Sequence, residues 1–190
     1  MSIFRRARCA SLVVAAALAA CETAPVGPGR SIDAAQSSIQ FTHPLYPDVQ
    51  GEYTQRSGSY SSQTETAFFP GKTGAVFVSY NQSAGDTYFS TTDIHEIVES
   101  IGTEPEKNEI KEEGELPDTF PVVQWASYSA IGEDGQAMSC VSITRNGASA
   151  GSAGGGAYTS ALIIATECRG PYMDLGEREA AMLSGGVRIR

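Results

Sequence analysis

The sequence contains few of the residues on which metal sites and membrane-spanning helices depend. Among 190 residues there are two histidines, four cysteines and one tryptophan. The histidines and cysteines include no closely spaced ligand pair, so a zinc site is not expected. The longest apolar run, from Cys9 to Ala20, has about a dozen residues, whereas a helix needs about 20 to cross the hydrocarbon core of a bilayer. The sequence therefore predicts no permanent transmembrane helix, no metal and no other cofactor.

Basic residues are also scarce. Thirteen lysines and arginines stand against 22 aspartates and glutamates, which gives a formal net charge of −9. A surface of this charge repels the phosphates of nucleic acids and the headgroups of anionic lipids. We therefore expect no nucleic-acid partner, and we expect no membrane contact through a polybasic patch.

The first 21 residues combine a basic start, an apolar run and a cysteine. Arg5, Arg6 and Arg8 lie before or at the start of the run, and the segment ends in Leu-Ala-Ala-Cys at positions 18–21. A basic region, a short apolar region and small residues before a cleavage point are typical of a secretory signal. With a cysteine directly after the small residues, the segment resembles the lipobox signal of bacterial lipoproteins.

This resemblance implies cleavage after Ala20 and attachment of acyl chains such as palmitate to Cys21. Two or three chains on one residue make a firm anchor, because a single chain binds membranes only reversibly. The resemblance places the protein in the bacterial cell envelope, facing the periplasm, and Glu22 favours the outer membrane over the inner membrane. An ordinary secretory signal with an incidental cysteine is the alternative. Cleavage leaves ten basic and 22 acidic residues, a formal net charge of −12.

Cysteine usage agrees with export. Cys9 leaves with the signal and Cys21 is consumed by the lipid, so Cys140 and Cys168 remain. An even pair of cysteines in an oxidising compartment predicts a disulfide. Two independent buried thiols are the alternative.

Composition divides the chain into three parts. We predict a signal peptide over residues 1–20, a lipidated cysteine with a flexible tether over 21–37, and one globular domain over 38–190. The tether is assigned from its Pro, Gly, Ala and Ser content. The remaining residues are numerous enough to bury a core.

Hydrophobic periodicity predicts the elements of the domain. Ile94, Ile97, Val98 and Ile101 share one helical stripe, with a capping box at Asp93 and Glu96. A second capping box is expected at Asp174 and Glu177, followed by a helix to about Ser184. Strands are expected over 39–42, 63–69, 74–80, 119–128, 137–145, 157–168 and 187–190. Residues 104–118, with seven acids, indicate a solvated loop or a frayed helix.

These elements predict an α+β domain. We expect an antiparallel sheet of about five to six strands with two helices packed on one face.

No catalytic arrangement is predicted. The letters Gly-Ala-Ser-Ala-Gly over 147–151 match a nucleophile elbow, but a Gly-rich loop follows where a helix is needed, and no histidine follows His95. The run Gly-Lys-Thr over 71–73 lacks the earlier glycine of a phosphate-binding loop, so a hairpin turn is expected. His43 and His95 are expected to be surface or capping residues, with metal ligation or general base catalysis as the alternative. Trp125 is expected in the core, with a recognition groove as the alternative.

The sequence thus predicts a non-enzymatic envelope lipoprotein. Its periplasmic domain would act as a binding or structural module, with the membrane contacted through acyl chains on Cys21 and an envelope protein as a possible partner. The alternative is a carrier of a small ligand or lipid, with a cavity between the sheet and the helices. An enzyme of unfamiliar type is the third hypothesis.

Overall fold

The computed structural model describes residues 28–58, 62–83, 89–90, 93–101, 104, 107–119, 121–132, 134–146, 158–159 and 161–190. The predicted signal, Cys21 and the Gly-rich segment over 147–156 lie outside the described residues. Among the described helices, none has the length and apolar content needed to cross a bilayer.

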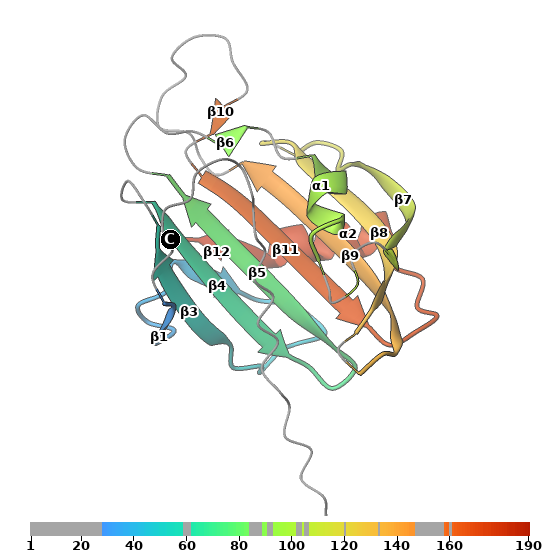
Figure 1. Cartoon of the computed structure of the whole chain (residues 1–190), viewed down its shortest axis with the longest axis horizontal. Helices are drawn as coiled ribbons and strands as arrows, with labels where there is room; N and C mark the ends of the chain where they lie inside the picture. Colours follow the sequence, from blue (N-terminus) through green and yellow to red (C-terminus); the bar gives the residue numbers. More distant parts are fainter. Residues whose placement is uncertain are drawn as a thin grey trace, which may run out of the picture.

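One eight-stranded sheet dominates the structure and runs across the view in Figure 1, in the order β1-β3-β4-β5-β11-β9-β8-β7. Every neighbouring pair is antiparallel. The strands are β1 (Arg30–Ile32), β3 (Glu52–Ser57), β4 (Gln63–Pro70), β5 (Gly74–Gln82), β7 (Glu109–Glu115), β8 (Val123–Ile131), β9 (Ala137–Asn146) and β11 (Ala161–Arg169). The α+β class and the antiparallel sheet are confirmed, but the predicted five to six strands are too few.

The strands that the sequence did not predict are the polar ones near the sheet edges. β7 reads EIKEEGE and lies within residues 104–118, which were expected to form a loop or a frayed helix. That expectation is wrong for 109–115. An edge strand takes its hydrogen bonds from one neighbour and needs no apolar face, and charged side chains protect such an edge from pairing with other molecules. Hydrophobic alternation therefore gives no signal there.

Two helices cover opposite faces of the sheet, which corrects the expectation that both pack on one face. α1 (Ile94–Val98) buries Ile94, Ile97 and Val98 in a cluster with residues of β8, β9 and β11. α2 (Glu177–Gly186) buries Ala180 and Leu183 in the cluster on the other face. In Figure 1, α1 lies in front of the sheet and α2 lies behind it.

The central strands explain this arrangement. Most residues of β8 and β9 and nearly all residues of β11 are buried, so both faces of these strands need a cover. Successive side chains of a strand point to opposite faces. Cys140 accordingly packs with α1, whereas its neighbour Val141 packs with α2.

The helix caps follow the sequence at one helix and depart from it at the other. Asp93 is the N-cap of α1, and its side chain accepts a hydrogen bond from the backbone N–H of His95 at 3.0 Å, which confirms the cap but not the predicted capping box with Glu96. α2 begins later than predicted, with Gly176 as its N-cap, and the Gly176 N–H donates to the Glu179 carboxylate at 3.2 Å. The predicted cap at Asp174 is therefore wrong.

Two short ribbons complete the fold. β2 (Ile39–Phe41) pairs with β12 (Val187–Ile189), which confirms strands at both ends of the predicted domain. β6 (Phe89–Ser90) pairs with β10 (Tyr158–Thr159). The backbone N–H of Thr42 donates to the carbonyl of Gly186 at 2.9 Å. A Cβ at Gly186 would collide with the Thr42 carbonyl, so glycine allows α2 to end against β2.

The folded domain begins earlier than the sequence indicated. β1 starts at Arg30, inside the predicted tether over 21–37. The buried carboxylate of Glu65 on β4 then accepts hydrogen bonds from the backbone N–H of Ser38 at 2.7 Å, the Ser38 hydroxyl at 3.1 Å and the Ser37 hydroxyl at 3.2 Å. Residues 30–38 are thus held to the sheet.

Candidate functional site

The predicted disulfide is present. Cys140 on β9 and Cys168 on β11 are directly opposite each other in adjacent antiparallel strands. Their Cα atoms are 4.1 Å apart and their sulfur atoms are 2.09 Å apart. The pair lies on the α1 face of the sheet.

A buried cluster of charged and polar side chains lies behind the disulfide, on the α2 face. Glu167 and Arg169 flank Cys168 in β11, and His43 and Tyr46 come from the loop after β2. Glu167 is 0% exposed, His43 and Tyr46 are each 4% exposed, and Arg169 is 8% exposed. These four residues are called the Glu167 cluster below.

The Glu167 carboxylate holds the cluster together. Its Oε1 accepts hydrogen bonds from Arg169 Nε at 2.8 Å and from the Tyr46 hydroxyl at 3.0 Å. Its Oε2 lies 3.9 Å from His43 Nε2, which is too far for a hydrogen bond. The Tyr46 hydrogen bond therefore holds the loop after β2, which is remote in sequence, against the central strand β11.

The hydrogen bonds also define the tautomer and the protonation state of the His43 ring. Its Nδ1 accepts from the backbone N–H of Leu45 at 3.2 Å, so the proton of the neutral ring is on Nε2. Burial lowers the pKa of His43, against the opposing effect of the Glu167 carboxylate. His43 is therefore neutral at pH 7. Its Nε2, Glu167 Oε2 and Arg169 Nη2 are buried and have no hydrogen-bond partner.

Tyr46 acts as a donor in the cluster. Burial, together with the nearby Glu167 carboxylate, raises the pKa of Tyr46 well above its usual range. Its hydroxyl stays protonated and donates to Glu167. All four side chains are enclosed, so the cluster in this conformation positions the loop and is closed to a substrate.

The expectation that His43 lies on the surface is wrong, whereas its side chain does cap the backbone N–H of Leu45. A signal for the cluster was available in β11, where Glu167 and Arg169 follow the apolar run ALIIAT within one strand. Charged residues are almost never fully buried without a partner. A strand of this composition therefore indicates a buried ion pair, although it does not reveal the loop that completes it.

His43 is predicted to make stability depend on pH. A histidine whose pKa is lowered by folding stabilises the protein above the pKa of the unfolded state, about 6.5, and this contribution is lost as pH falls through the folded-state value. We expect the free energy of unfolding to decrease below about pH 6.5. His43→Gln should flatten this dependence in urea titrations between pH 5 and 7.

His95→Gln is the matched control, since the chain has only these two histidines. The His95 side chain is 50% exposed and pairs with Glu113. An equal flattening in both variants would contradict the assignment to His43.

The other residues singled out from the sequence lie apart from the cluster. Residues 71–73 form the β4–β5 turn, where the Gly71 N–H donates to the carbonyl of Gly74 at 2.8 Å. Trp125 is 5% exposed and belongs to the core on the α2 face. The Gly-Ala-Ser-Ala-Gly run lies outside the described residues. In the part of the chain that the structure describes, no three His, Cys, Asp or Glu side chains are grouped so as to hold a metal ion.

A groove runs along α2. It has a volume of about 580 Å³ and is open to solvent. Its walls are the connection between β7 and β8 and one side of the helix. The lining residues are Leu116, Pro117, Thr119, Glu177, Arg178, Ala181, Ser184 and Gly185.

Comparisons with known proteins give no further guidance. No protein-family model, no curated protein and no solved structure shows a significant match to this chain.

Proposed function

We propose that this protein is exported and anchored to a bacterial membrane through acyl chains on Cys21, and that its folded domain is a binding or structural module of the cell envelope. The observation that carries the proposal is the lipobox pattern at positions 18–21, behind a basic and apolar segment. We place the protein facing the periplasm and favour the outer membrane.

The cysteine pair supports this proposal. Disulfides persist in oxidising compartments such as the bacterial periplasm and are rare in the cytosol. Cys140 and Cys168 are bonded inside the folded domain, so the domain suits an exported protein.

Among the residues that the structure describes, the contacts of the Glu167 cluster favour a module over an enzyme. The Glu167 cluster is enclosed, and its hydrogen bonds connect two parts of the same chain. These hydrogen bonds hold the loop that contains Tyr46 against β11, and this is a structural role.

The acyl anchor can be tested with two cysteine variants. Mass spectrometry of membrane-extracted protein should find the mature N-terminus at Cys21 with diacylglyceryl and acyl masses. Cys21→Ala should abolish this modification and remove the protein from the membrane fraction. Cys9→Ala, which changes the other cysteine of the signal, should leave the acyl modification and the membrane association unchanged.

Recovery of an unmodified Cys21 peptide from correctly expressed wild-type protein would overturn the proposal. Recovery of protein that keeps its signal and has free thiols at Cys9 and Cys21 would also overturn the proposal.

The α2 groove favours a second candidate function, carriage of a small apolar ligand. The groove has a volume of about 580 Å³, is open to solvent and has Leu116, Pro117 and Ala181 among its lining residues. Ala181 lines the groove, so Ala181→Trp should fill it. A fatty acid that raises the melting temperature of the wild type but not that of Ala181→Trp would support this function. Equal melting temperatures with and without fatty acid would exclude that ligand.

A further inference from the structure

The charges of the domain are distributed unevenly across the sheet. The chain after Ala20 has ten basic residues against 22 acidic residues. Arg30, Arg56, Arg188 and Arg190 lie at the β1 side of the fold, and we call them the arginine edge.

The contacts of these arginines place them around β1 and β3. Arg30 on β1 donates from Nε to the side chain of Gln55 at 3.1 Å. Arg56 on β3 lies against Gly29, because a Cβ at Gly29 would be 2.8 Å from the Arg56 Nε. These two side chains therefore lie beside the residues through which the chain joins the sheet.

The C-terminal arginines extend the same region. The backbone N–H of Arg190 donates to the Ser38 carbonyl at 3.0 Å. Burial raises the pKa of Tyr53 on β3, and the positive charge of Arg190 opposes this rise. Arg188 is exposed on β12, opposite Gln40. Figure 1 places the C-terminus beside the β1 side of the sheet.

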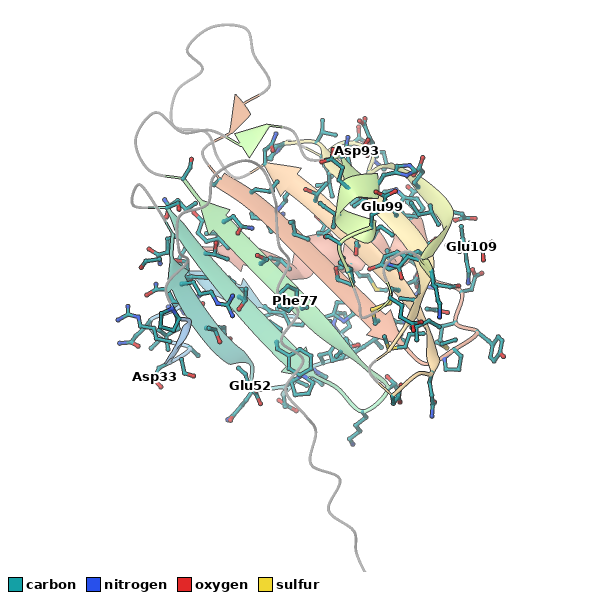
Figure 2. The ribbon with its side chains drawn as sticks, in the orientation of Figure 1. Asp33, Glu52, Phe77, Asp93, Glu99 and Glu109 are labelled. Atoms are coloured by element: carbon teal, nitrogen blue, oxygen red, sulfur yellow. A yellow bond between two sulfur atoms is a disulfide. The ribbon has the colours of Figure 1, made fainter. Side chains whose placement is uncertain are left out.

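The opposite edge of the sheet is acidic. β7 is the last strand at that edge and carries Glu109, Glu112, Glu113 and Glu115 with one lysine. Strands of a sheet are spaced about 4.8 Å apart, so the edges of eight strands are separated by about 34 Å. In Figure 2, Asp33 beside β1 and Glu109 on β7 mark the two sides.

Because the two edges of the sheet are far apart, the net charge of the whole domain does not predict how each edge interacts with a membrane. The Debye length is about 8 Å at physiological ionic strength. A charged surface that touches one edge is therefore screened from the other edge. The net charge of the whole domain predicts repulsion from an anionic membrane, whereas the arginine edge by itself is attractive.

Three acids reduce the charge of this region, and one of them, the buried Glu65, accepts a hydrogen bond from Gln55, the partner of Arg30. Asp33 follows β1 and Glu52 begins β3, and both are exposed. β1 and β3 are antiparallel, with Arg30 opposite Gln55 and Ile32 opposite Tyr53. Arg30 and Arg56 therefore lie toward one end of this strand pair, and Asp33 and Glu52 lie toward the other end.

The proposed acyl anchor brings this edge to the membrane. Nine residue steps separate Cys21 from Arg30, and an extended chain spans at most about 3.6 Å per residue, which is about 32 Å in total. β1 is the first strand after Cys21 among the described residues, so the arginine edge is the described part of the sheet that the anchor holds nearest to the bilayer.

We propose that the arginine edge binds the anionic phospholipid headgroups of the membrane that holds Cys21, and so orients the domain with β1 toward the bilayer and β7 away from it. This proposal rests on the proposed acyl anchor. The oriented domain would present its acidic β7 edge, α1 and the β7–β8 connection to other components of the envelope.

The test uses the lipidated protein reconstituted in vesicles, with a spin label at Ser31→Cys on β1 or at Glu109→Cys on β7. A nickel chelate on lipid headgroups relaxes a nearby label. In vesicles of phosphatidylethanolamine with phosphatidylglycerol, we expect strong relaxation at position 31 and weak relaxation at position 109. In phosphatidylcholine vesicles, or at 0.5 M salt, relaxation at position 31 should decrease.

A charge-matched pair of variants isolates the arginine edge. Changing Arg30, Arg56, Arg188 and Arg190 to Gln should reduce the population in contact with anionic headgroups by about fivefold per arginine. The control changes Lys72, Lys107, Lys111 and Arg178 to Gln and should leave relaxation at position 31 unchanged. Thermal melts establish that both variants fold.

The two proposals fail in different ways. Anchored protein whose label at position 31 responds neither to headgroup charge nor to the arginine substitutions overturns the orientation alone, and so does an equal response in the control variant. Protein that does not float with any vesicle and has an unmodified Cys21 overturns the anchor, and the orientation with it.

Discussion

Glu167→Gln is expected to lower the free energy of unfolding by about 3–5 kcal/mol, because removal of one partner leaves a buried charge uncompensated. The carboxylate is fully buried and accepts hydrogen bonds from both Arg169 and Tyr46. An amide can replace the hydrogen-bond acceptor but not the charge that Arg169 needs. Urea titration of the purified domain, monitored by circular dichroism, measures the loss.

A double variant separates this charge effect from simple loss of packing. Replacement of a buried ion pair by apolar residues of similar volume is often neutral or stabilising. The combination of Glu167→Leu and Arg169→Met should therefore cost less than Glu167→Gln alone. The ion pair does not act as described if Glu167→Gln costs under about 1 kcal/mol. The same holds if the losses measured for Glu167→Leu and for Arg169→Met, each made alone, add up to the loss of the double variant.

Breaking the bond between Cys140 and Cys168 is expected to cost about 3–4 kcal/mol. The two cysteines are 28 positions apart, and a cross-link that closes a loop of this length removes conformational entropy from the unfolded chain. The double variant Cys140→Ala, Cys168→Ala should show a lower urea midpoint than oxidised wild type.

Reduced wild-type protein is the control for this experiment. Dithiothreitol removes the cross-link while both side chains stay in the cluster beside α1. Reduced wild type should lose most of the same stability, and dithiothreitol should have no effect on the double variant. If oxidised and reduced wild type unfold at the same urea concentration, the cross-link makes no contribution.

Local patterns in the sequence were sufficient for several elements. The apolar stripe through Ile94, Ile97, Val98 and Ile101, with Asp93 before it, predicted a helix and its N-cap here, although α1 ends at Val98, before Ile101. Helical spacing and capping depend on residues within one or two turns, so this information is contained in a short segment. The β4–β5 hairpin was predicted for the same reason, from two β-rich runs around Pro70 and Gly71.

The edge strands and the faces of the helices could not be predicted in this way. β7 has no apolar alternation because its pairing with β8, and not burial, makes it a strand. β9 and β11 are buried on both faces and do not alternate between apolar and polar residues, so their sequences do not specify which face receives which helix. Both features depend on the order of strands in the sheet.

The sequence alone established the acidic composition, the lipobox pattern and the cysteine pair, since each is a property of residue types or short motifs. Only the tertiary structure decided that His43 and Tyr46 close over Glu167, from which Tyr46 is 121 positions distant. It also gathered the arginines of both chain ends on one edge and the glutamates of β7 on the other. Contacts of this kind depend on how separate segments pack, and no local pattern encodes the partner.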